Sequence, residues 1–142
     1  MHLKFLISII LIIIISSCSI NNEDDTPKFV RSECHLKNVS GGLVGVNNDF
    51  DFNQIIWMFD EFQSSITVLN NNTNPLEDGL DSGSYVYSIL NDGNNTFLII
   101  DGNEYGSITV LTNNLIIDQN LTSTGTGADG FIYSFQLVET IE

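Results

Sequence analysis

Basic residues are scarce in this chain, and their scarcity limits its partners. The 142 residues include four Lys and Arg against 18 Asp and Glu, and the formal net charge is −14. No Lys, Arg or His follows Lys37, whereas acidic residues continue from Asp49 to Glu142. Without a basic surface the chain cannot neutralise phosphates, so we expect it to bind no nucleic acid.

Residues for nucleophilic or metal chemistry are also few, with only two His and two Cys. His2 lies in the N-terminal leader described below, which leaves His35 beside Cys34 on a predicted strand. Neighbouring strand residues point to opposite faces, so these two form no nucleophile–base pair. Zinc or iron would need several such ligands. We therefore expect no enzyme activity, catalytic residue, cofactor or metal site. Cys34 is expected to be a small buried residue, or alternatively a free thiol that pairs with another chain.

A membrane-spanning hydrophobic run is missing as well. Residues 5–15 are almost wholly apolar and follow Lys4, but a transmembrane helix needs about 20 such residues. The run suits a cleaved export signal better. The sequence Ile15-Ser16-Ser17-Cys18 resembles a lipobox, the site at which bacterial lipoprotein precursors are acylated on cysteine. The resemblance implies a signal peptide over residues 1–17 and acyl chains such as palmitate on Cys18.

The acylated Cys18 would attach the protein to the outer membrane, on its periplasmic face or on the cell surface. Residues 18–28 are polar and acidic, which is typical of a flexible tether. The acidic run also resembles the surface-export signal of Bacteroidetes lipoproteins. Residues 29–142 have the length of a single domain and contain no second linker.

The body of the chain predicts an all-β domain. Gly and Asn recur every eight to twelve residues or so, and the runs between them are rich in Ile, Val, Phe, Tyr and Thr. The strands predicted are 33–39, 54–59, 65–69, 84–90, 96–100, 105–111, 115–118 and 130–138. About eight strands joined by short turns favour an antiparallel meander. Closure into a barrel would remove the exposed edges, and an open curved sheet or a sandwich is the alternative.

Residues 36–137 resemble the small lipocalin-like lipoproteins of flavobacteria and other Bacteroidetes. The motifs that carry the resemblance are Asn38-Val39-Ser40-Gly41-Gly42 with Gly45, Ile56-Trp57-Met58-Phe59, Thr67-Val68, Gly83-Ser84-Tyr85-Val86-Tyr87, Leu98-Ile99-Ile100-Asp101, Tyr105-Gly106-Ser107-Ile108, Leu115-Ile116-Ile117-Asp118, Asp129-Gly130 and Phe135. The resemblance implies a small barrel in the cell envelope. The chain departs from the pattern at residues 32–36, which lack the Gly-x-Trp element of a first lipocalin strand. With the short length of the domain, this departure argues against a roomy cavity.

Aromatic side chains are the residues of this chain best suited to bind a ligand. Five of them fall on predicted strands and are the candidate ligand-binding residues: Trp57, Tyr85, Tyr87, Tyr105 and Tyr133. They either fill the core, line a cavity for a small hydrophobic ligand, or form an exposed platform that stacks on sugars. A non-catalytic, lipid-anchored protein that binds such a ligand is the first hypothesis. A structural, partner-binding or glycan-binding lipoprotein with a solid core is the alternative, and the oligomeric state stays open.

Two short segments resemble ligand-binding motifs, but we expect them to be a loop and a strand that bind no ligand. Residues 125–130, GTGADG, match the G-x-G-x-x-G dinucleotide pattern, but that pattern must open a helix. A strand follows instead, so the segment is expected to be a loop that ends in a tight Asp129-Gly130 turn. Residues 49–53, DFDFN, look like the start of a calcium loop but lack its glycine, and we expect a strand with an acidic outer face there. Residues 77–81, EDGLD, are the better calcium candidate.

Overall fold

The computed structural model describes residues 30–141 and places the side chains of residues 32–138. The predicted signal peptide, the lipidation site Cys18 and the predicted tether lie outside the described residues. The strands are β1 (Val30–Gly41), β2 (Val46–Asp49), β3 (Ile55–Asp60), β4 (Ser65–Asn70), β5 (Gly83–Asp92), β6 (Asn95–Ile100), β7 (Asn103–Val110), β8 (Asn114–Asp118), β9 (Leu121–Thr122), β10 (Gly125–Thr126) and β11 (Phe131–Ile141).

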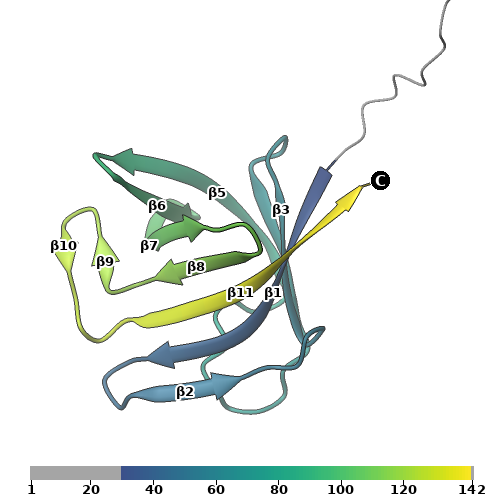
Figure 1. Cartoon of the computed structure of the whole chain (residues 1–142), viewed down its shortest axis with the longest axis horizontal. Coiled ribbons are helices and arrows are strands. Elements are labelled where there is room, and N and C mark those ends of the chain that lie inside the picture. Colours follow the sequence, from purple (N-terminus) through teal and green to yellow (C-terminus); the bar gives the residue numbers. More distant parts are fainter. Residues whose placement is uncertain (1–29, 142) are drawn as a thin grey trace, which may run out of the picture.

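The strands form a closed antiparallel barrel (Figure 1). The main sheet has nine strands in the order β11-β8-β7-β6-β5-β4-β3-β1-β2, and β11 also pairs with β1. This last pairing closes a ring of eight strands and leaves β2 outside it. The long strand β1 makes both arrangements possible, because its first half pairs with β3, its second half pairs with β2, and β11 runs along its other edge. The prediction of an all-β, eight-stranded meander that closes into a barrel is confirmed.

Apolar side chains that alternate along the strands point inward and fill the barrel, as the sequence predicts. In β3, Ile55 and Trp57 are fully buried, and in β11 Tyr133 and Phe135 are buried on the same inward face. The apolar strand β6 is buried on both faces, since the adjacent residues Phe97 and Leu98 are both inaccessible to solvent. The core is one continuous cluster of buried residues from β1, β3, β4, β6, β8 and β11, and partly buried residues of β5 and β7 pack against it.

The prediction of a strand over residues 49–53 is wrong. β2 ends at Asp49, and residues 50–54 form a turn-rich connection to β3. Phe50 is buried in the core cluster, and the ring of Phe52 lies on His35. The alternation of acidic and aromatic residues therefore reflects a loop with two apolar anchors.

The GTGADG segment is more structured than predicted. Gly125 and Thr126 form β10, which pairs with β9 in a small separate hairpin. No helix follows, because β11 begins at Phe131, and so the context for a dinucleotide is absent from this segment. Gly130 lies where an added Cβ would come within 2.7 Å of the backbone carbon of Gln119. Glycine is required here for close approach between two chain segments, not for the tight turn we expected.

Candidate ligand-binding site

The barrel has two ends that differ in how they are filled. One end carries the β3–β4, β5–β6 and β7–β8 turns, together with the start of β1 and the end of β11. We call it the open end. The other end carries the β4–β5 loop, residues 71–82, and we call it the closed end. Because neighbouring strands are antiparallel, each turn is assigned to an end by the strand order alone.

Aromatic side chains fill the closed end. The Trp57 ring centroid lies 5.7 Å from that of Tyr105 and 5.1 Å from that of Phe135, and Tyr105 lies 5.8 Å from Tyr133, all in tilted arrangements. The β4–β5 loop covers this cluster. A Cβ at Gly79 would lie 3.2 Å from the Trp57 ring, so the loop backbone approaches the indole as closely as glycine allows.

One polar contact joins the β4–β5 loop to the aromatic cluster, and another joins two parts of the loop to each other. The Tyr133 hydroxyl donates a hydrogen bond to Glu77 Oε1 at 2.9 Å. The Asn72 side-chain amide donates to Asp78 Oδ2 at 2.8 Å. Burial raises the pKa of Tyr105 to about 12, and burial followed by the nearby Tyr105 and Glu77 raises the pKa of Tyr133. Both phenols therefore stay neutral at physiological pH, as a donor to a carboxylate must.

A cavity of about 860 Å³ occupies the open end. Its lining includes apolar side chains from both sides of the barrel: Cys34, Phe59, Tyr87, Ile89, Ile108, Val110, Leu115 and Leu137. Phe62 and the polar residues Ser32, Asp60, Glu61, Gln63 and Thr96 complete the lining. Cys34 and Leu115 also belong to the core cluster, so the cavity floor is the top of the core. The volume falls within the range of roughly 300–1,000 Å³ typical of small-molecule sites.

The cavity wall is apolar inside and acidic at its rim. Phe59 and Tyr87 meet edge to face with their centroids 5.3 Å apart. The pKa of Tyr87 is raised, first by burial and then by the negative charges of Glu61 and Asp60. Burial raises the pKa of the Cys34 thiol to about 12, so this side chain is a protonated, apolar part of the wall and not a nucleophile at neutral pH.

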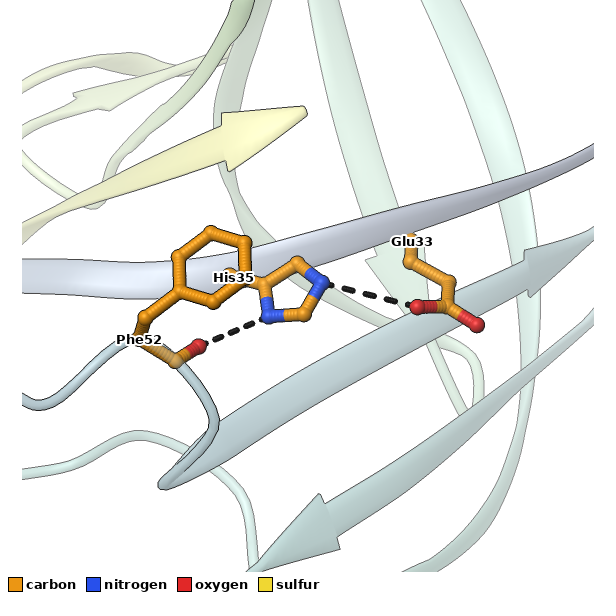
Figure 2. A network of polar contacts seen from close by, with 3 residues as sticks. All are labelled: Glu33, His35 and Phe52. Carbon is orange, nitrogen blue, oxygen red and sulfur yellow. Dashed lines mark hydrogen bonds and ion pairs between the residues drawn. The ribbon is translucent and has the colours of Figure 1, made fainter. Parts of the chain in front are cut away.

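His35 is the one histidine among residues 30–141, and its ring contacts Phe52 and Glu33 (Figure 2). His35 Nδ1 donates to the carbonyl oxygen of Phe52 at 2.7 Å, and Nε2 lies 3.5 Å from Glu33 Oε2. The Phe52 ring stacks on the imidazole at 4.0 Å and leaves His35 only 3% exposed. Cys34 faces the cavity and His35 faces outward (Figure 2), as expected for neighbouring residues of a strand. His35 holds the β2–β3 connection against β1.

The structure separates the five candidate residues of the sequence analysis. Tyr87 lines the cavity, whereas Trp57, Tyr105 and Tyr133 belong to the filled closed end. The Tyr85 hydroxyl donates to the Asp81 carbonyl at 2.9 Å, so Tyr85 supports the β4–β5 loop. Because Trp57 is fully buried, it cannot form a sugar-stacking platform.

The lining residues that were missed share inward faces with predicted ones. Phe59 alternates with Trp57 on β3, and Leu137 alternates with Phe135 on β11. Alternation therefore identifies them as inward-facing residues. Only the position of the β4–β5 loop decides which end of each strand meets empty space.

Among residues 32–138, no three His, Cys, Asp or Glu side chains gather in a geometry suited to a metal ion. In the calcium candidate, Glu77 and Asp78 accept hydrogen bonds from Tyr133 and Asn72 as described above. No helix in the described part of the chain is long and apolar enough to cross a membrane.

Comparison with models of known families, with curated proteins and with solved structures finds no match to this chain. The class of the protein, a small antiparallel β-barrel with one hollow end, therefore rests on its own sequence and geometry.

Proposed function

We propose that this protein is a non-catalytic, lipid-anchored protein of the cell envelope that binds a small hydrophobic ligand at the open end of its barrel. The observation that carries the proposal is the cavity of about 860 Å³, whose inner wall is apolar and continuous with the core. Attachment through acylated Cys18 at the outer membrane is the part of the proposal that rests on the N-terminal sequence.

The shape and chemistry of the cavity favour an amphiphile with one alkyl tail. The deep part of the cavity wall consists of Cys34, Ile108 and Leu115, whose side chains need no hydrogen-bond partner in a ligand. The polar groups are concentrated at the rim, where Asp60 and Glu61 lie. An alkyl chain would bury its length against the wall and leave an uncharged or cationic head group at the acidic rim.

The alternative of a solid-cored structural or partner-binding protein is supported by the closed end alone. There the aromatic cluster and the β4–β5 loop pack closely against each other around Trp57. The cavity at the open end is the reason to prefer ligand binding.

A homologous series of straight-chain alcohols tests the proposal on a chain that begins at Phe29, which retains every described strand. We expect affinity to rise about fourfold for each added methylene, because burial of one methylene contributes about 0.8 kcal/mol, until the tail fills the cavity. Isothermal titration calorimetry measures this series directly, and a negative heat-capacity change should accompany binding.

Carboxylates of the same chain lengths provide the matched comparison. They should bind more weakly than the alcohols at neutral pH because of the charges of Asp60 and Glu61, and the difference should shrink as salt screens those charges. Affinity that does not depend on chain length would refute an apolar cavity as the binding site.

A further inference from the structure

Exposed apolar side chains gather on the turns that surround the cavity opening. Phe62 on the β3–β4 turn is 91% exposed, and three residues near the neighbouring turns are also exposed: Leu90 near the end of β5, Val110 at the end of β7, and Leu111 on the β7–β8 turn. Phe62 and Val110 line the same cavity, so these turns border one opening. Large apolar residues clustered around a ligand entrance mark a surface that contacts another protein or a membrane when the protein functions.

The turn that carries Phe62 is held in place. The Asp60 side chain accepts a hydrogen bond from the Gln63 backbone N–H at 2.9 Å, and the Ser64 carbonyl accepts one from the Tyr87 N–H at 2.9 Å. Phe62 is therefore presented to solvent by an ordered turn, and its insertion into another phase would cost little conformational entropy.

The chain enters the barrel at this same end. β1 begins there at Val30, next to the end of β11 (Figure 1). Val30 lies 12 positions after Cys18 in the sequence, and this length of chain reaches at most about 40 Å when fully extended. The 12 residues of β1 themselves cover about 40 Å. If Cys18 is anchored in lipid, the tether joins the barrel at its open end, which favours contact of that end with the membrane surface.

Charge indicates which lipid surface fits. Asp60, Glu61 and Asp92 lie at or beside the turns of the open end, where they outnumber the one basic residue of the described strands at this end, Arg31 at the start of β1. The other Lys or Arg among residues 30–141 is Lys37, which lies over the Phe52 ring. An anionic bilayer would repel this end, whereas a zwitterionic bilayer would accept its apolar side chains without that repulsion.

We propose that the open end docks on a zwitterionic lipid bilayer through Phe62, Leu90, Val110 and Leu111, so that the cavity opens toward the membrane and takes its ligand from the lipid. The inference rests on the proposed ligand-binding function and adds the source of the ligand. The ordered Phe62 turn provides the principal contact.

Quenching of tryptophan fluorescence by lipids brominated on their acyl chains tests the docking. The full chain is reconstituted into phosphatidylcholine vesicles in three forms: unaltered, Phe62→Trp and Leu43→Trp. Trp57 is the only natural tryptophan and is fully buried, so it gives a common background. Leu43 is the matched control, because it is 84% exposed and lies on the β1–β2 turn at the closed end.

We expect brominated lipid to quench more than half of the emission added by Phe62→Trp and almost none of that added by Leu43→Trp. Replacement of part of the lipid by anionic phosphatidylglycerol should reduce the quenching of Phe62→Trp at low salt. Equal quenching of the two variants, or no quenching of Phe62→Trp, would overturn the docking. Alcohol binding measured in solution stays independent of this result, so a failure of docking is distinguishable from a failure of the ligand-binding proposal.

Discussion

Replacement of Ile108 by tryptophan is expected to weaken the binding of a long-chain alcohol by at least about tenfold. Ile108 lies on β7, and its side chain lines the cavity while it packs against the core. An indole at this position would occupy the space of part of the tail. Exclusion of two methylenes alone removes about 1.6 kcal/mol of burial free energy, which corresponds to more than tenfold in affinity. Calorimetric titration of the variant measures the loss.

Two further variants make the interpretation secure. Leu137→Phe narrows the same cavity from β11 and should also weaken binding. Val86→Trp places the same indole on β5 at a position that is 66% exposed and does not line the cavity, and it should leave affinity unchanged. Equal affinities for Ile108→Trp and Val86→Trp would show that the ligand binds elsewhere.

Trp57→Ala is expected to lower the free energy of unfolding by about 3–5 kcal/mol, the usual cost of removing a large buried aromatic side chain. Trp57 is fully buried between Tyr105, Phe135 and the loop backbone at Gly79. Its loss would leave a void beneath the β4–β5 loop that the surrounding strands cannot close. Urea denaturation with an unchanged m-value measures this difference in stability.

Trp57→Phe and Tyr87→Ala are the controls for this prediction. Trp57 Nε1 is buried and has no hydrogen-bond partner, so Trp57→Phe removes an unsatisfied donor and should cost less than half as much. Tyr87 already borders the empty cavity, so Tyr87→Ala should also cost much less. If Tyr87→Ala proved as destabilising as Trp57→Ala, the division into a filled end and a hollow end would be wrong.

The sequence predicts most of the strands because two signals depend only on neighbouring residues: the alternation of inward-facing and outward-facing side chains along a strand, and the Gly and Asn residues of the turns. Trp57 alternates with Phe59, and the strands expected at 54–59 and 130–138 match β3 and β11 closely. β2 was missed because it has a single apolar residue, Val46, and forms only by pairing with the second half of β1. Such a strand depends on its partner and leaves little local signal.

The location of the site could not be predicted in the same way. Trp57 and Phe59 share a strand face, yet one belongs to the filled end and the other lines the cavity. The difference comes from the β4–β5 loop, whose glycine at position 79 lies against Trp57 after the barrel has closed. The absence of a Gly-x-Trp element and the short domain argued against a roomy cavity, but the loop fills one end only and leaves the other hollow.

The most direct test of ligand binding at the open end is photochemical mapping of a bound tail. An alcohol with a diazirine at the end of its alkyl chain is irradiated with the protein, and mass spectrometry locates the adducts. The account predicts adducts on deep wall residues such as Cys34, Ile108 and Leu115. Adducts confined to the closed end, for example at Leu43 and Val44, or spread over the outer surface would contradict it.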